Sequence, residues 1–499
     1  MVAAAHRWLL AGLLALLMAA PPPTSAAPAW LRAGDQRLAA GDILEAELAY
    51  GRAEAAGAPT EELWLRKGLC LLAEARPDDA EAAFGQVVGG PRLAEAWIGR
   101  GDVWARRGDF AAAAAWWQAA VGQGASPEGW LRLGWAELRR GRFWQAQEAL
   151  GRAWEGGEQS CAASYGLAAL WALADTAAAA RWLQAPCSAP DDPHWTWWPA
   201  AHPGRLQTEA LAAALAQADR ADDEPGRAAA LGTAFTRLGL HPLAERAWLA
   251  AVQGRPSWGA AWAYLGHARL AQGRPALDAL EQAVALEPDS PLGWYFLGRW
   301  FMVQGVPQAA LAPLQQGLVL DPNNAGLLLE LAAAHLALGD YPAALRALDE
   351  AVAQQPDDAA IWFGAARLTL EHLLQVPERG LPAAERALIL APDHAAAHDL
   401  VGWGAWLSGD EPRARWETDL ALRLDPTLAS AWYHKAVQEA AQERALTARQ
   451  AYMRAVRHDP EGFYGDRAAR ALREMQARSG PGVGLDRFLG KPMFTPPQG

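Results

Sequence analysis

Apolar residues along most of the chain recur at spacings of three and four, which places them in one stripe on the face of an α-helix. The stripes come in pairs, each predicting two helices of about 13 residues. Between the members of a pair lie short Gly-Asp steps, at Gly41-Asp42, Gly108-Asp109, Gly339-Asp340 and Gly409-Asp410. Glycine readily takes the left-handed conformation that ends a helix, so these steps turn the chain back. The pattern therefore predicts a succession of helical hairpins.

The predicted hairpins repeat with an almost constant period. The prolines that close them lie 34, 34, 36, 34 and 34 residues apart, at Pro288, Pro322, Pro356, Pro392, Pro426 and Pro460. Upstream, spacings of 34, 33 and 33 residues separate Trp30, Trp64, Trp97 and Trp130. The one longer interval predicts an extended turn over residues 375–382. Because a single hairpin cannot bury its own apolar face, neighbouring hairpins must stack into a solenoid.

The residues within one period form a motif. Trp294-x2-Leu297-Gly298-x2-Phe301 begins one period, and Trp262-x2-Leu265-Gly266 begins another; an alanine and a large residue four positions later follow, as in Ala80/Phe84 and Ala113/Trp117. This order resembles the tetratricopeptide repeat (TPR), with its W-x2-L-G-x2-Y, A-x3-F and P positions. The resemblance extends over about 85% of the chain. It implies an all-α fold, a right-handed TPR superhelix (α-solenoid) of about 12 helix-turn-helix repeats in two arrays.

The period also divides the chain. We expect an N-terminal TPR array of about five repeats over residues 28–186 and a C-terminal array of about seven over residues 225–462. Residues 187–224 break the period with a Trp/Pro-rich start, so they form either a connector that acts as a hinge or a degenerate repeat that keeps the stack continuous. An amphipathic capping helix is expected over residues 463–478, and a flexible Gly/Pro-rich tail over residues 479–499.

The N-terminal residues 1–27 have the three parts of a secretory signal peptide. A start carrying Arg7 precedes an apolar stretch from Trp8 to Ala20, and prolines and small residues follow. The apolar stretch is well short of the roughly 20 residues that a membrane-spanning helix needs. We expect cleavage near Ala26, the alternative being a retained anchor. The mature protein is then exported, either periplasmic and associated with the cell envelope or secreted, with no membrane span.

The three cysteines, Cys70, Cys161 and Cys187, leave at least one unpaired within the monomer. Cys161 begins the first helix of the fifth predicted repeat and Cys187 follows its second helix, so both fall at the same end of a hairpin. In an exported protein the two could form a disulfide. The alternative is that both are reduced and buried as small apolar residues.

Composition narrows the classes of function. Acidic residues outnumber basic ones by 56 to 44, giving a net charge of −12, so no nucleic-acid partner is expected. Only three of the basic residues are lysines, a bias typical of a GC-rich bacterial genome. The sequence holds no GxxxxGK[ST], HExxH, GxSxG or CxxC motif, so we expect no catalytic residues, no enzymatic activity and no cofactor.

One histidine pair has the spacing of metal ligands. His394 and His398 are four residues apart, beside Asp393 and Asp399. However, His398 stands where other repeats carry their packing tryptophan, and His394 lies in the preceding turn. We therefore interpret them as a packing residue and a turn residue, and we expect no metal site.

The TPR resemblance implies that certain first-helix positions face a concave groove. On that basis the candidate partner-binding residues are Trp135, Arg139, His267, Tyr295, Arg299, Phe363, Arg367, Asp399, Trp403, Trp406 and Tyr433. Two interpretations stay open for each of them: it packs against a neighbouring first helix, or it binds a partner, with arginines as carboxylate or carbonyl partners and aromatic rings as anchors.

The sequence thus predicts a non-enzymatic TPR scaffold or adaptor that mediates protein–protein interactions in the bacterial cell envelope through its concave groove. Its partner would be a protein or peptide whose identity and pathway the sequence does not reveal. The alternative is a glycan-binding TPR component of envelope polysaccharide assembly or export, since aromatic rings suit the apolar faces of sugars. Both rest on the resemblance rather than on a catalytic or binding motif.

Overall fold

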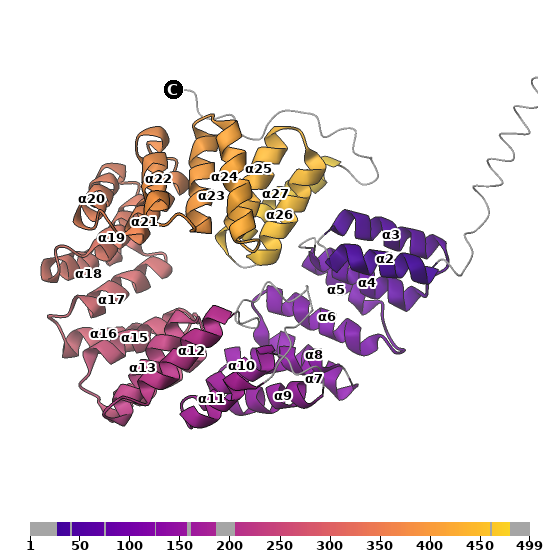
Figure 1. Ribbon diagram of the computed structural model, residues 1–499, viewed down its shortest axis with the longest axis horizontal. Coiled ribbons are helices and arrows are strands. Elements are labelled where there is room, and N and C mark those ends of the chain that lie inside the picture. The colour runs from indigo at the N-terminus through magenta and orange to yellow at the C-terminus, as the bar shows by residue number, and fades with distance from the viewer. Residues whose placement is uncertain are drawn as a thin grey trace, which may run out of the picture. The chain divides into compact units, whose positions relative to one another are not determined.

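The computed structural model describes residues 27–39, 42–73, 76–124, 126–156, 161–185, 205–459 and 462–479 (Figure 1). Over these ranges the chain forms helices and no strand. Most of the predicted signal peptide, the Trp/Pro-rich start of the connector and the predicted tail lie outside the described residues. The chain divides into two compact units, Met1–Ala125 and Ser126–Gly499, and each is described by itself.

The described residues of the first unit form three helical hairpins. In each, two consecutive helices pack along each other, and each hairpin contacts the next through its adjacent helices. The helices are α2 (Ala27–Ala39), α3 (Ile43–Ala55), α4 (Thr60–Ala73), α5 (Pro77–Gly85), α6 (Leu93–Arg106) and α7 (Phe110–Gly122).

The second unit continues the same arrangement. Its first hairpins are built from α8 (Pro127–Arg139), α9 (Phe143–Glu155), α10 (Cys161–Trp171) and α11 (Thr176–Gln184), and α12 (Arg205–Ala218) then contacts α11 and α13. The later helices are α13 (Glu224–Arg237), α14 (His241–Gly254), α15 (Gly259–Leu270), α16 (Leu277–Leu286), α17 (Pro291–Val303), α18 (Pro307–Leu320), α19 (Ala325–Ala337), α20 (Tyr341–Gln354), α21 (Ala359–Glu371), α22 (Leu381–Leu390), α23 (Ala395–Leu407), α24 (Glu411–Leu424), α25 (Ala429–Ala441), α26 (Ala445–His458) and α27 (Phe463–Ser479).

The helix-turn-helix solenoid predicted from the sequence is confirmed. From α13 to α26, each first helix packs on its own second helix and each second helix packs on the following first helix. The final helix, α27, packs on α26 and α25. The extended turn expected around residues 375–382 contains a π-helix, η4 (Val376–Gly380), preceded by left-handed backbone at Leu373 and Gln375.

The Gly-Asp steps make the turns within the hairpins. Gly108, Gly339 and Gly409 have φ values of 76°, 76° and 86°, in the region that favours glycine. The following aspartate then caps the second helix: the carboxylate of Asp109 accepts hydrogen bonds from the backbone N–H groups of Ala111 and Ala112. Asp340 and Asp410 cap their helices in the same way. Gly41, the fourth such glycine, lies outside the described residues.

A second glycine position brings the two helices of eight hairpins together. A Cβ atom placed on Gly134 of α8 would lie 2.7 Å from Cγ of Leu150 on α9, closer than real Cβ contacts. The same opposition of a first-helix glycine to a larger second-helix side chain recurs through both units, in Gly34/Tyr50, Gly68/Phe84, Gly101/Trp117, Gly232/Trp248, Gly266/Leu280, Gly298/Leu314 and Gly402/Thr418.

The packing tryptophan and the closing proline, the two most regular features of the sequence, are joined by a hydrogen bond. Indole Nε1–H groups donate to the carbonyl oxygen of the proline six residues earlier at 2.8–2.9 Å, in Trp262/Pro256, Trp294/Pro288, Trp362/Pro356 and Trp432/Pro426. Each bond ties the start of a first helix to the end of the preceding repeat. In these four repeats, the constant separation of the proline and the tryptophan therefore follows from one recurring contact.

Candidate functional site

The first helices of the second unit contact one another in succession. α15 packs on α17, α17 on α19, α19 on α21, α21 on α23, and α23 on α25. Most of the predicted partner-binding residues lie on these helices, and we call them the first-helix row: His267, Tyr295, Arg299, Phe363, Arg367, Asp399, Trp403, Trp406 and Tyr433.

The middle of the first-helix row is organised by Glu330 of α19, which the sequence did not single out. Its Oε1 accepts a hydrogen bond from the Tyr295 hydroxyl at 3.3 Å and lies 3.4 Å from Nε of Arg299. Burial, followed by the nearby Glu330 carboxylate, raises the pKa of Tyr295, so this phenol stays protonated and can donate. Two of the predicted residues thus share one carboxylate from the next repeat.

His267 lies beside this group on α15. Its ring stacks on Phe296 with centroids 4.7 Å apart and meets His241 of α14 edge to face at 6.4 Å. Burial, and then the charges of Arg299 and His241, lower the pKa of His267 to about 4. The imidazole is therefore neutral at neutral pH and acts as a flat packing group rather than as a cation.

Further along the row, Arg367 and Phe363 project from α21. Nη1 of Arg367 pairs with Oε2 of Glu371 at 3.3 Å within the same helix, and Phe363 packs edge to face on His394 with centroids 5.2 Å apart. Glu371 also accepts a hydrogen bond at 3.3 Å from the hydroxyl of Tyr464, which belongs to α27. The last helix of the chain therefore reaches α21 and covers the end of the row.

Beneath Tyr464 lies a buried acid–histidine pair. Asp399 Oδ1 and His434 Nδ1 are 2.8 Å apart, Trp403 stacks on the His434 ring at 4.3 Å, and both Tyr433 and His434 contact Tyr464. Asp399 is 1% exposed and Tyr433 is also buried. The expectation that Asp399 and Tyr433 face a partner is therefore wrong, because the neighbouring first helix and α27 surround them.

The remaining aromatic residues of the row are less enclosed. Trp403 and Trp406 are half-buried, and one face of the Trp403 ring is covered by His434. Of these two indoles, Trp403 therefore also has a packing role within the repeat stack.

The two earlier candidates lie on α8 and differ from each other. Trp135 is 1% exposed and stacks on Tyr165 of α10 with centroids 6.4 Å apart, so the expectation that it binds a partner is wrong. Its ring fills the space between two first helices. Arg139, at the end of α8, is exposed.

His394 and His398 do not converge on a common point. Nδ1 of His394 accepts a hydrogen bond from the backbone N–H of Ala397 and caps α23. His398 Nε2 lies 2.9 Å from the Pro392 carbonyl oxygen, the contact made elsewhere by the packing indole, and its Nδ1 lies 2.6 Å from buried Glu417. A carbonyl oxygen can only accept, so Nε2 carries a hydrogen and donates. His398 thus replaces tryptophan in the repeat.

Cys161, at the start of α10, is disulfide-bonded. Cys187, the partner that the sequence suggests for it, lies outside the described residues. Cys70 is a buried thiol in α4 of the first unit.

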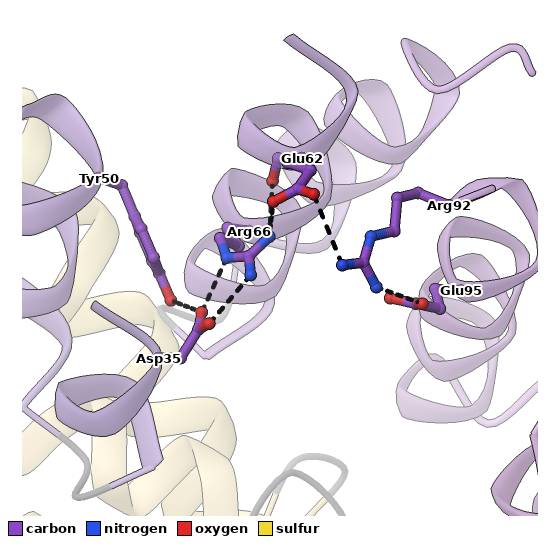
Figure 2. A network of polar contacts seen from close by, with 6 residues as sticks. All are labelled: Asp35, Tyr50, Glu62, Arg66, Arg92 and Glu95. Atoms are coloured by element: carbon purple, nitrogen blue, oxygen red, sulfur yellow. Dashed lines mark hydrogen bonds and ion pairs between the residues drawn. The ribbon is translucent and has the colours of Figure 1, made fainter. Parts of the chain in front are cut away.

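The first unit has a polar network of its own, which the sequence did not predict (Figure 2). Asp35 of α2 receives two hydrogen bonds from Arg66 of α4, at 2.8 and 2.9 Å, and one from the Tyr50 hydroxyl at 2.9 Å. The network continues from Arg66 through Glu62, Arg92 and Glu95. It links the first helices of three consecutive repeats, since Arg92 precedes α6 directly.

Comparison with known proteins identifies the repeat. Family models described as tetratricopeptide repeat match residues 74–129, 265–325 and 325–368. No curated protein matches the chain.

Solved structures with a similar course of helices include the following three. A thermophilic TPR protein from Thermus thermophilus is 22% identical over 36% of this chain and 99% of that one, with a TM-score of 0.34. Yeast Tom70 is 14% identical over 92% of this chain and 97% of that one, with a TM-score of 0.40. A tetratricopeptide repeat protein from Parabacteroides merdae is 16% identical over 51% of this chain and 98% of that one, with a TM-score of 0.41.

Proposed function

The chain is a tetratricopeptide repeat protein, and from this premise we propose that it is a non-enzymatic scaffold or adaptor that binds a protein partner through the first-helix row. Repeats of this kind present side chains from successive first helices at a regular spacing, which suits an extended or helical segment of another protein. The proposal concerns the part of the row from α15 to α21, because beyond it Asp399 of α23 is buried and Tyr464 of α27 packs on Tyr433 of α25.

The observation that carries the proposal is the exposure of Arg299 and Arg367. Their side chains are 40% and 47% exposed, and each pairs with a carboxylate at long distance, Arg299 with Glu330 at 3.4 Å and Arg367 with Glu371 at 3.3 Å. Guanidinium has five N–H donors, so each can still bind a carboxylate or backbone carbonyl of a partner. The phenol of Tyr295, which is hydrogen-bonded to Glu330, supplies an aromatic surface next to Arg299.

For the compartment, we propose the bacterial cell envelope. Support comes from the signal-peptide pattern of residues 1–27 and from the disulfide at Cys161, a bond that persists in oxidising compartments. No helix within the described ranges is both long and apolar enough to span a membrane. Fractionation of the native host, with mass spectrometry of the N-terminus, tests this. Recovery in the cytoplasm with an intact N-terminus would contradict it.

The alternative is binding of a glycan to Trp403 and Trp406, whose indoles are half-buried. The two functions differ in their salt dependence. Peptide binding through Arg299 and Arg367 weakens as ionic strength rises, whereas stacking of sugars on indole is nearly independent of salt. Intrinsic fluorescence titrated with peptide and oligosaccharide libraries at two salt concentrations separates them. If neither kind of ligand changes the spectrum, the first-helix row loses its support as a binding surface.

A further inference from the structure

A hollow of about 450 Å³ opens at the start of α9 in the second unit. It is formed by the turn between α8 and α9, the first turns of α9, the end of α10 and one side chain of α14. Its lining residues are Gly141, Arg142, Phe143, Trp144, Gln145, Gln147, Leu170 and Arg246. This volume lies within the range of small ligand sites, and the hollow shares no residue with the first-helix row.

The hollow is positively charged in a protein whose net charge is −12. Two arginines line it and no acidic residue does. The Arg246 guanidinium lies over the Phe143 ring, 4.9 Å from its centroid, and no carboxylate within the described ranges pairs with it. An arginine held on an aromatic face is ordered while its N–H groups stay available at the ring's edge.

The second arginine is also weakly engaged. Nε of Arg142 lies 3.7 Å from Oε2 of Glu137, beyond hydrogen-bond distance, while Arg140 binds the other oxygen of Glu137 at 2.7 Å. Glu137 is therefore already neutralised by Arg140. Arg142 and Arg246 together offer two guanidinium groups to an incoming anion.

Trp144 adds an apolar surface that the repeat does not need. Its side chain is 69% exposed, although it is one of the largest apolar groups in the chain. It is the second residue of its second helix, a position that is filled elsewhere by Ala111, Gln308, Pro342, Pro412 and Leu446. Since residues as different as Ala, Gln, Pro and Leu serve the fold at this position, the fold does not require an indole there, and an exposed indole beside two arginines is explained better by binding than by packing.

We propose that this hollow is a second docking site of the scaffold and that it binds an acidic peptide segment. Carboxylates of the segment pair with Arg142 and Arg246, an apolar side chain next to them packs on Trp144, and the amides of Gln145 and Gln147 bond its backbone. The proposal rests on the proposed function in that the ligand belongs to a protein partner. It differs in placing the binding site outside the first-helix row and in requiring an acidic segment of the partner.

The test uses the full chain and an array of dodecapeptides, each carrying three Asp or Glu residues around one Leu, Phe or Trp. Every peptide has a counterpart with Asn or Gln in place of the acids, and polygalacturonate is measured alongside. We expect acidic peptides to bind at least about 10-fold more tightly than their counterparts, because paired charge-assisted hydrogen bonds are lost in the latter. Binding should fall by about as much in Arg142→Ala/Arg246→Ala and in Trp144→Ala.

The matched control is Trp416→Ala/Arg423→Ala, which removes another exposed indole and arginine and should leave binding unchanged. Arg299→Ala/Arg367→Ala should also leave binding of the acidic peptides unchanged. A wrong assignment of the hollow can therefore be distinguished from a wrong assignment of the first-helix row. The proposal is overturned if no acidic peptide binds better than its counterpart, if the hollow variants bind as the parent does, or if polygalacturonate alone binds.

Discussion

The hydroxyl of Tyr464 on α27 donates a hydrogen bond to Glu371 on α21, across 93 residues of sequence. A helix that closes the apolar end of the solenoid thus also places a side chain over its first-helix row. Burial, followed by the charges of Asp399 and Glu371, raises the pKa of Tyr464, which keeps this phenol a donor. Tyr464 consequently covers parts of α21 and α25, whereas Trp403 and Trp406 of α23 stay half-buried.

Tyr464→Phe should weaken the docking of α27 by about 1 kcal/mol, because it removes one hydrogen bond and keeps the ring. Hydrogen exchange of peptides from α27 measures the change, and faster exchange is expected. The control is Tyr341→Phe, at an exposed tyrosine, for which no change is expected. Equal exchange in Tyr464→Phe and the parent would show that the contact with Glu371 does not hold the helix.

Because the two helices of a hairpin approach closely, replacing two glycines of one repeat with alanine should have opposite effects on stability. Gly134→Ala forces a Cβ against Leu150 and should destabilise the repeat by about 1–3 kcal/mol. Gly151→Ala, in the middle of α9 with nothing within 4 Å of the new Cβ, should stabilise it by roughly 0.5–1 kcal/mol. Melting temperatures measure both changes: the value for Gly134→Ala should lie below that of the parent, and the value for Gly151→Ala above it. A higher melting temperature for Gly134→Ala would be incompatible with the packing described.

The depressed pKa of His267 predicts a dependence of stability on pH. In the folded state this pKa is about 4, below its ordinary value of 6.5, so between these values protons bind His267 preferentially in the unfolded chain. Its contribution to the free energy of unfolding is present above pH 6.5 and is lost as pH falls toward 4. The loss should be about 1–2 kcal/mol, allowing for partial exposure.

His267→Phe removes this titration and keeps a ring that can stack on Phe296. Melting temperatures of parent and variant between pH 7 and pH 4 should therefore converge or cross in favour of the variant at the acidic end. Arg299 and His241, which face His267, are unchanged in both proteins. If the melting temperatures of parent and variant changed in parallel with pH, His267 would not contribute to the pH dependence of stability.

The polar network of the first unit predicts that replacing Asp35 destabilises the helices around it. Asp35→Asn removes the carboxylate that binds both Arg66 and Tyr50 and should cost about 1–2 kcal/mol, since Arg66 is largely buried while Asp35 is not. Hydrogen exchange in α2 and α4 should increase. Asp78→Asn, at an exposed acid paired with Arg107, is the matched control and should change exchange little. Similar effects for both variants would contradict the role given to Asp35.

The repeat itself could be predicted from the sequence because each of its signals is a local physical requirement. The Gly-Asp steps satisfy a left-handed turn and a helix cap, and the first-helix glycines permit close packing. In four repeats of the second unit, the recurring tryptophan and proline are joined by a hydrogen bond. The packing role of His398 could be predicted in the same way, because its ring Nε2 stands where the indole Nε1 of the packing tryptophan stands in other repeats and contacts the equivalent proline carbonyl oxygen.

Whether an individual groove candidate is buried or exposed could not be predicted, because its burial depends on which side chain the next repeat places against it. Asp399 and Trp135 are buried by His434 and Tyr165, and α27 covers Tyr433. One usable signal exists: Tyr295/Glu330 and Asp399/His434 are each 35 residues apart, about one repeat. Pairing polar residues at that separation would have identified Glu330 and His434 from the sequence.

Binding of a protein partner by the exposed arginines of the first-helix row is tested most directly by quantitative affinity capture from an envelope fraction. The parent protein is compared with Arg299→Ala/Arg367→Ala and with Arg152→Ala/Arg423→Ala; Arg152 and Arg423 lie on second helices. We predict that a protein captured by the parent falls by at least about 10-fold with the first variant and is retained with the second. Equal capture by all three would contradict the account.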